Sequence, residues 1–153
     1  MSRIVEIVVD GGPGSGKSAV LKRAKELENE DTGVIVISET ATEVFSAGIC
    51  PGDKYGLSNE EFQKHILFVQ IDKEKWCRKI AEQYKNKKTV ILLKDRSTMS
   101  GSAYLPPGQF EDMIRELRMS VSKLRDSNDG VIHLVTAAIG AKKSYTTANN
   151  SAR

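Results

Sequence analysis

The sequence predicts an α/β domain built around a parallel sheet, and three observations support this fold class. Short β-branched runs alternate with longer segments of helical periodicity, which is typical of βαβ units. The strand-like runs are almost continuously apolar, as expected for strands buried on both faces. The 153 residues suffice for one domain that buries a core without disulfides or a structural metal. We therefore predict a single domain over residues 1–153, in which 136–153 form a polar lid or tail.

The apolar pattern places each element in turn. Strands are expected at 4–9, 34–38, 89–94 and 131–135. Between the second and third strands, Ser58 and Glu61 have capping-box spacing and predict the start of one long helix, or of two joined near Lys73. A further helix is predicted over 109–125. The long helix is expected to bury a stripe of six residues: Phe62, Ile66, Val69, Trp76, Ile80 and Tyr84.

Composition and charge exclude several classes of protein. Hydrophobic residues make up 39% of the chain and charged residues 28%, and the net charge of +3 is too small to indicate a nucleic-acid partner. No apolar stretch reaches the roughly 18 residues of a membrane span, and the N-terminal run is too short for a signal peptide. Cys50 and Cys77 form no CxxC and are interpreted as free thiols, so we expect a cytoplasmic protein.

The segment GGPGSGKS, residues 11–18, follows the first predicted strand and opens a helix. Its spacing, G-x-x-x-x-G-K-S, is that of the phosphate-binding P-loop, or Walker A motif. Glycines allow the backbone N–H groups to turn toward a polyphosphate, and the helix start adds its positive dipole end. Nucleotide contacts are therefore expected from seven consecutive residues: Gly12, Pro13, Gly14, Ser15, Gly16, Lys17 and Ser18.

Two side chains of this loop have chemistry of their own. Lys17 supplies a mobile cation for the outer phosphates and is a candidate catalytic residue, while Ser18 is placed to bind Mg²⁺. We expect Mg²⁺ with ATP or GTP, and the lack of an N-K-x-D guanine signature favours ATP. The alternative, a glycine-rich turn with an incidental lysine, is disfavoured by the complete motif and the preceding strand.

A second candidate site lies at the end of the third predicted strand. Asp95 emerges where open α/β sheets place their ligands, at the carboxyl edge. It could bind Mg²⁺ or accept a proton from an attacking hydroxyl, and Arg96 could bind an anionic acceptor or a migrating phosphoryl group. The alternative is structural: Asp95 would cap the following turn and Arg96 would form a surface ion pair.

Glu39 follows the second predicted strand at the start of a helix. It is a candidate catalytic residue, because at this edge it could face Lys17 and act as an acceptor-side base or bind an acceptor's sugar. The equally weighted alternative is a carboxylate that only complements the helix dipole. Gln63 and Gln70 share a helix face but are interpreted as solvated side chains flanking a core stripe, and we assign them no site role.

Five segments together carry a resemblance to a known family. They are the phosphate loop, SETATEV, FQKHILFVQIDKE, LLKDRSTMSGSAYL and LRDSNDGVIHLVTAAIGAKKSYTTANNSAR, which span nearly the whole chain. The chain resembles the P-loop ATPase/kinase-like AAA domain family that groups the kinase part of NadR with the eukaryotic translocation-defect ATPase (the NadR/Ttd type). It is more similar to the translocation-defect branch, through VIHLVTAAIGA and YTTANNSAR.

The resemblance implies a fold and roles by position. It implies a nucleoside-kinase-like, three-layer sandwich with strand order 2-3-1-4-5 and an ATP or GTP site. Residues 11–18 match the nucleotide loop, Glu39 matches the family's strand-two glutamate, and Asp95 and Arg96 match its D-R-G element. Ser97 stands in place of that glycine, which we expect to narrow the space for a substrate.

The family's pattern continues beyond this chain's last residue. We therefore expect a truncated domain with strand order 2-3-1-4, a missing fifth strand, and self-association through the open sheet edge. The sequence favours a nucleotide-dependent regulatory ATPase or GTPase that reports its nucleotide state to a protein or lipid partner. The alternative is a kinase that transfers the ATP γ-phosphate to a small, nucleoside-like hydroxyl acceptor.

Overall fold

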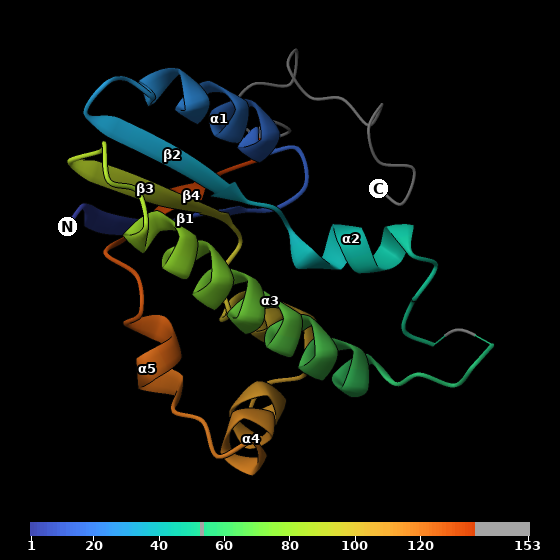
Figure 1. Cartoon of the computed structure of the whole chain (residues 1–153). Coiled ribbons are helices and arrows are strands. Elements are labelled where there is room, and N and C mark those ends of the chain that lie inside the picture. Colours follow the sequence, from blue (N-terminus) through green and yellow to red (C-terminus); the bar gives the residue numbers. More distant parts are fainter. Residues whose placement is uncertain (53, 137–153) are drawn as a thin grey trace.

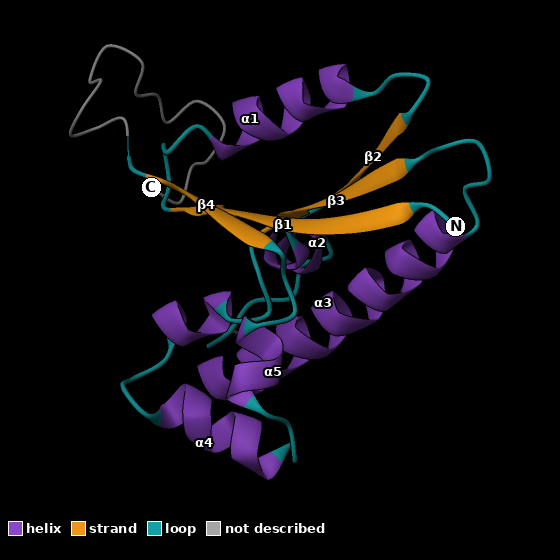
Figure 2. Ribbon diagram, turned by 90° about the vertical axis from the view of Figure 1, so that its left-hand side faces the viewer, coloured by secondary structure: helices purple, strands orange, loops and turns teal. Residues whose placement is uncertain are grey.

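One parallel sheet lies between helices that cover its two faces (Figures 1 and 2). The computed structural model describes residues 1–52 and 54–136. Within this part of the chain the sheet has four strands in the order β2-β3-β1-β4, and every neighbouring pair is parallel. The predicted α/β class with a parallel sheet is confirmed. The strands are β1 (Arg3–Gly11), β2 (Thr32–Ile37), β3 (Thr89–Asp95) and β4 (Gly130–Leu134).

The helices form the outer layers. In Figure 2, α1 covers one face of the sheet and α3 the other, with α4 and α5 lying beyond α3. The predicted capping box is present, since Ser58 Oγ accepts from the Glu61 amide while the Glu61 carboxylate accepts from the Ser58 amide. The helices are α1 (Lys17–Ala24), α2 (Thr40–Ser46), α3 (Asn59–Glu82), α4 (Gln109–Glu116) and α5 (Val121–Arg125), with short 3-10 turns η1 (Lys25–Leu27) and η2 (Ser100–Tyr104).

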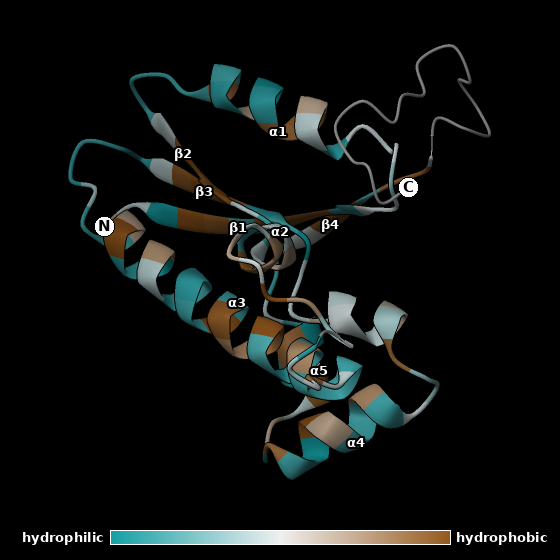
Figure 3. Ribbon diagram, turned by 90° about the vertical axis from the view of Figure 1, so that its right-hand side faces the viewer, coloured by the Kyte–Doolittle hydropathy of each residue, from teal (hydrophilic) through white to brown (hydrophobic). Residues whose placement is uncertain are grey.

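Within the described residues the core has three parts: one on each face of the sheet, and a third in which Leu67 of α3 packs with Phe110 and Met113 of α4. Val9 and Leu93 pack with Leu21 beneath α1, whereas Val90 and Leu92 pack with residues of α3 on the opposite face. Side chains alternate along β3, so this strand contributes to the parts on both faces of the sheet. The hydrophobic colouring of the strands against the largely hydrophilic α1 in Figure 3 agrees with this arrangement.

The predicted inner stripe of α3 is wrong in part. Phe62 is buried, but Val69 is 40% exposed and Trp76 is 65% exposed. Gln63 and Gln70 of this helix are buried instead, at 8% and 4% exposed. The apolar spacing failed here because α3 runs beside a polar site, where buried amides replace apolar residues.

Two other expectations need correction. The helix expected over 109–125 is broken into α4 and α5, and Arg118 between them has a φ of 54°, in the left-handed region that ends a helix. The fourth strand was expected to be buried on both faces, but Val131 is 62% exposed and Ile132 is 43% exposed. β4 is bonded to β1 alone in the described sheet, which explains this exposure.

The predicted lid or tail, 136–153, lies outside the described residues except for Thr136, whose hydroxyl donates to the carbonyl oxygen of Pro13 at 3.2 Å. Cys50 and Cys77 are free thiols. Among the helices of the described residues, none is both long enough and apolar enough to cross a membrane.

Candidate functional site

The segment between β1 and α1 forms a loop whose backbone requires glycine at two positions. Gly14 and Gly16 have φ angles of 72° and 87°, a region that side chains disfavour. Gly16 is also the N-cap of α1, and its carbonyl oxygen accepts from the Val20 amide at 3.1 Å. The loop therefore leads directly into a helix amino end, an arrangement that offers N–H groups to an anion.

Gly11 lies where the structure leaves no room for a side chain. A Cβ at this position would be 2.5 Å from the carbonyl oxygen of Leu134 and 2.7 Å from Oγ of Ser15. Leu134 ends β4, so the loop begins in direct contact with the edge strand. Oγ of Ser15 is buried and has no hydrogen-bond partner within the described residues. The loop is thus closely packed at its start and contains an unpaired polar atom.

Lys17 folds back over this loop. Its Nζ donates to the carbonyl oxygen of Gly11 at 2.8 Å. Burial and the nearby charge of Arg96 lower the pKa of Lys17, although Asp95 and Glu39 act in the opposite direction. Among the described residues no ion pair joins Nζ of Lys17 to a carboxylate, and a phosphate at this loop could provide that negative charge.

Asp95 ends β3 and lies beside Val9 in the parallel pairing with β1. Its Oδ1 is buried and has no hydrogen-bond partner within the described residues. Burial and the carboxylate of Glu39 raise the pKa of Asp95, although Lys17 and Arg96 oppose the shift. The alternative in which Asp95 caps the following turn finds no hydrogen bond at Oδ1 among the described residues, and in that turn Ser100 Oγ accepts from the Ser97 amide at 3.0 Å.

Arg96 turns its side chain from β3 toward α2. The residue has a φ of 71°, and its amide donates to the carbonyl oxygen of Val9 at 3.0 Å. Its Nε donates to Oε1 of Glu39, and its guanidinium lies 5.8 Å from the ring centre of Tyr104. The sequence predicted Arg96 as a ligand for an anionic acceptor, but the structure pairs it with a carboxylate inside the site.

Glu39 is the N-cap of α2, yet its side chain makes no capping hydrogen bond. Its Oε1 accepts from Arg96, and its Oε2 accepts from the hydroxyl of Thr42 at 2.6 Å. Burial opposes the charge, but the Thr42 hydroxyl and Arg96 outweigh it and lower the pKa of Glu39. The carboxylate therefore lines the site while it also stands at the amino end of α2, and its pKa is lowered there.

Asp10 is a site residue that the sequence analysis missed. It follows the buried Val9 at the end of β1, and its Oδ1 accepts from the Gly11 amide at 2.8 Å. The same oxygen lies 3.7 Å from Nη1 of Arg96. Its position directly before the glycine loop, at the carboxyl edge of a central strand, was the available signal.

A cavity of about 560 Å³ brings part of this set together. Its charged and hydroxyl lining comes from Lys17, Ser18, Glu39, Asp95 and Arg96, and its aromatic lining from Phe45, Phe62, Tyr104 and Phe110. The two kinds of lining adjoin where the Arg96 guanidinium lies over the Tyr104 ring, and Phe45 stacks on Phe62 with ring centres 5.2 Å apart. Ser97 also lines the cavity, and its hydroxyl accepts from the Met99 amide at 3.1 Å.

The cavity also contains the two glutamines that were expected to be solvated. Gln70 is bonded at both ends of its amide, to Thr40 and to Glu74. Gln63 is 8% exposed, lines the cavity, and makes no side-chain hydrogen bond that the described residues provide. A largely buried glutamine that lines a cavity beside aromatic residues is a candidate ligand contact. The seven-residue spacing in the sequence was the signal.

The oxygen donors of the cavity bear on whether Mg²⁺ could bind here. Among the described residues, no group of three or more His, Cys, Asp or Glu side chains could hold a metal by itself. Ser18 and Asp95 line the same cavity, and the unpaired Oδ1 of Asp95 is an oxygen donor of the kind that Mg²⁺ prefers. These residues fit an ion that takes most of its ligands from water and phosphate, as Mg²⁺ does at nucleotide sites.

The fold and the site define an α/β protein with a glycine loop, a lysine and a carboxylate at the carboxyl edge of a parallel sheet. No protein-family model matches the chain, and no curated protein matches it either.

Proposed function

We propose that the chain is a P-loop domain of the NadR/Ttd type that binds a nucleoside triphosphate with Mg²⁺ and acts as a regulatory ATPase or GTPase. One observation carries the proposal: Lys17 and Asp95 line the same cavity beside a loop with two left-handed glycines. A lysine and a carboxylate at such a loop are the minimum that phosphate and metal binding require. A regulatory role further implies a cytoplasmic protein or lipid partner that senses the bound nucleotide.

Each side chain has a distinct role in this proposal. The loop amides and Lys17 bind the phosphates, while Ser18 and Asp95 hold the ion. Bound Mg²⁺ would neutralise charge on the outer phosphates. Nε of Arg96 is paired with Glu39, which leaves the Nη N–H groups of the same guanidinium to contact a phosphate. Because the Glu39 carboxylate offsets part of the Arg96 charge, this pairing supports slow hydrolysis in the absence of a partner or acceptor.

A phosphotransferase is the second candidate, and the cavity favours it. A space of about 560 Å³ beyond the phosphate loop exceeds what a hydrolytic water needs. An acceptor hydroxyl there would attack the γ-phosphorus and pass its proton to a carboxylate, with release of the nucleoside diphosphate. The raised pKa of Asp95 suits it to take the proton better than Glu39, whose pKa is lowered.

A nucleotide panel tests both candidates. Binding of ATP, GTP and their diphosphates is measured by calorimetry with and without Mg²⁺, and turnover is followed as free phosphate and as phosphorylated product. Phosphate release without an acceptor supports the hydrolase, and product that requires a nucleoside or another hydroxyl compound supports the kinase. If no triphosphate binds to the wild type, or if Lys17→Ala binds as the wild type does, the proposal is wrong.

A further inference from the structure

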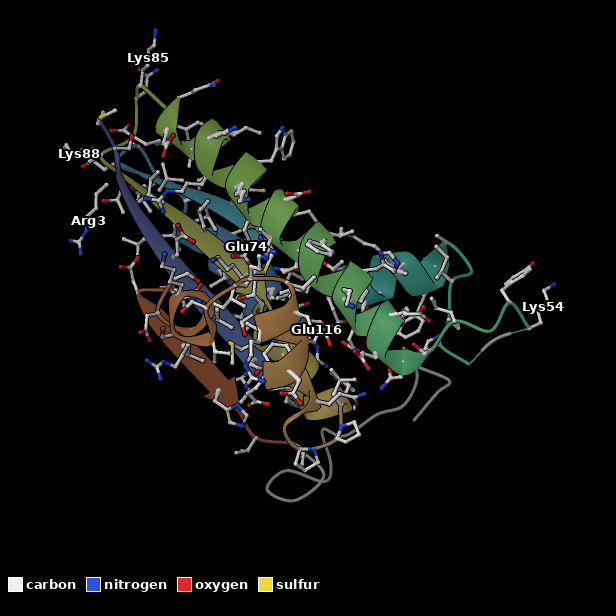
Figure 4. All side chains as sticks on the ribbon, turned by 90° about the horizontal axis from the view of Figure 1, so that it is seen from below. Arg3, Lys54, Glu74, Lys85, Lys88 and Glu116 are labelled. Atoms are coloured by element: carbon white, nitrogen blue, oxygen red, sulfur yellow. The ribbon has the colours of Figure 1, made fainter. Side chains whose placement is uncertain are left out.

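Lys94 is a lysine with no exposed surface at the centre of the fold. Its Nζ lies 2.7 Å from Oε2 of Glu6, 2.6 Å from Oε2 of Glu74 and 2.7 Å from Oδ1 of Asn128. These three partners come from β1, α3 and the segment before β4, and Figure 4 shows Glu74 where α3 passes over the sheet. Lys94 precedes Asp95 on β3, so the two side chains leave the strand on opposite faces.

A chain of hydrogen bonds leads from this lysine to the candidate site. The Glu74 carboxylate can only accept, so the amide nitrogen of Gln70 faces it and donates to Oε1 at 2.8 Å. The amide oxygen of Gln70 then points the other way and accepts from the hydroxyl of Thr40. We call this series the relay; its members are Lys94, Glu74, Gln70 and Thr40.

The relay closes into a ring through the candidate site. Thr40 is the first residue of α2 and directly follows Glu39. Glu39 accepts from Arg96, which lies two residues beyond Lys94 on the same chain segment. Lys94 and Arg96, between which the ring closes, therefore both lie at the end of β3. The start of α2 is held to β3 through the buried relay on one side and through the Glu39–Arg96 pair on the other.

We propose that the relay positions the Glu39–Arg96 pair against the phosphate-binding loop. The proposal rests on the proposed function, because it assigns the pair to the acceptor side of that site. Buried ion pairs contribute little net stability compared with apolar packing, since desolvation offsets their attraction. Because each buried charge needs its hydrogen-bond partners, such pairs do hold those groups in one arrangement. The members of the relay act as positioning residues. Thr40 lines the cavity, whereas Lys94 is buried on the face of the sheet that α3 covers.

Lys73 makes a second set of contacts at the start of α2. Nζ of Lys73 donates to the carbonyl oxygen of Ser38 at 2.8 Å and lies 3.3 Å from Oγ1 of Thr40. Gln70→Leu removes the relay but leaves Lys73 in place, so it separates the two. Arg78→Met is the matched control, because Arg78 pairs with Glu6 on the side of Lys94 away from the site.

The experiment uses the NMR signal of the Arg96 Nε–H group, assigned with Arg96→Lys. In Gln70→Leu and Thr40→Val we expect hydrogen exchange at this group to accelerate by up to about tenfold, the effect of losing one hydrogen bond from the ring. Thr40→Ser keeps the hydroxyl and should retain the wild-type rate, as should Arg78→Met. Turnover with saturating nucleotide should fall in parallel in the first two variants, with nucleotide affinity unchanged.

The two readouts separate the relay from the proposed function. A protected Arg96 signal in Gln70→Leu overturns the relay, whatever the turnover, and would leave Lys73 as the anchor. Equal acceleration in Arg78→Met also overturns it, since general loosening of the core would then be the cause. If the wild type shows neither binding nor turnover, the proposed function fails while the exchange rates still decide whether the relay holds the pair.

Discussion

Nε of Arg96 donates to Oε1 of Glu39, which joins the end of β3 to the start of α2 across the candidate site. The two residues lie 57 positions apart in the chain. Each was expected to face a ligand, and in the structure each is the other's partner. A ligand that takes Nε of Arg96 or the Glu39 carboxylate must therefore compete with this pair, whereas the Nη groups of Arg96 can be reached with the pair intact.

Replacement of Lys17 by alanine should weaken Mg-nucleotide binding by about 1.5–3 kcal/mol, the range for a hydrogen bond to a charged group. Calorimetry measures the loss. Lys22→Ala, an exposed lysine in the last turn of α1, should bind as the wild type does. Because the pKa of Lys17 is lowered and bound phosphate would raise it, binding at alkaline pH should take up protons. Unchanged affinity in Lys17→Ala would remove the basis for a P-loop.

Asp95→Asn should stabilise the fold and at the same time weaken Mg²⁺-dependent nucleotide binding. Burial and Glu39 raise the pKa of Asp95, so the folded state binds this proton more tightly than the unfolded state, and the ionised group costs stability at neutral pH. The substitution should raise the free energy of unfolding by on the order of 1 kcal/mol and weaken the Mg²⁺ dependence of nucleotide binding. Urea denaturation and calorimetry measure the two effects. Loss of stability together with wild-type Mg²⁺ dependence would make Asp95 a structural residue.

The glycine loop and the strand ends could be predicted because each depends on local sequence. Gly14 and Gly16 take left-handed backbone angles that glycine adopts readily, and Asp95 ends an apolar run. The burial of Lys94 could not be predicted, since a lysine at the end of a strand usually reaches solvent. Its partners come from segments 20 or more residues away, and only the tertiary fold brings them together.

The same limit applies to α3. Apolar spacing suggested that Trp76 faces the core, yet the buried face contains Gln63 and Gln70. Both amides line the cavity, and Gln70 is also bonded to the Glu74 carboxylate, surroundings that a periodicity based on hydrophobic residues cannot register. Candidate sites built from paired polar groups could therefore be located only in the structure.

Glu39→Gln should make the free energy of unfolding depend less on pH between pH 3 and 7. Burial opposes ionisation, but Thr42 and Arg96 lower the pKa of Glu39 below that of an unfolded glutamate, about 4.3. The stability from this group is therefore present above that value and is lost as pH falls through the lower, folded pKa. The variant should lose about 1–2 kcal/mol at neutral pH and less at pH 3. Thermal melts from pH 3 to 7 test this, with exposed Glu28→Gln as the control.

Lys94→Met should reduce the free energy of unfolding by about 3–5 kcal/mol, because it leaves the carboxylates of Glu6 and Glu74 buried near one another without their shared cation. Lys88→Met is the control. Lys88 pairs with Asp31 at 2.9 Å, but both side chains are exposed, so the loss should be below about 1 kcal/mol. Urea denaturation measures both. Equal losses in the two variants would show that Lys94 behaves as a surface lysine.

Alanine at Gly11 tests whether the loop must have this shape. The new Cβ would lie 2.5 Å from the Leu134 carbonyl oxygen and 2.7 Å from Oγ of Ser15, closer than such atoms approach, so either the loop or β4 must shift. We expect a loss of about 1–3 kcal/mol in unfolding free energy, as for other overpacked sites. Gly12→Ala is the matched control, because a Cβ there meets nothing within 4 Å, and its stability should stay within about 0.5 kcal/mol of wild type. Nucleotide affinity should fall in Gly11→Ala, since the displaced loop no longer directs its amides at the phosphates. Wild-type affinity in that variant would mean that phosphate binding does not depend on this backbone, and the loop would then be an ordinary turn.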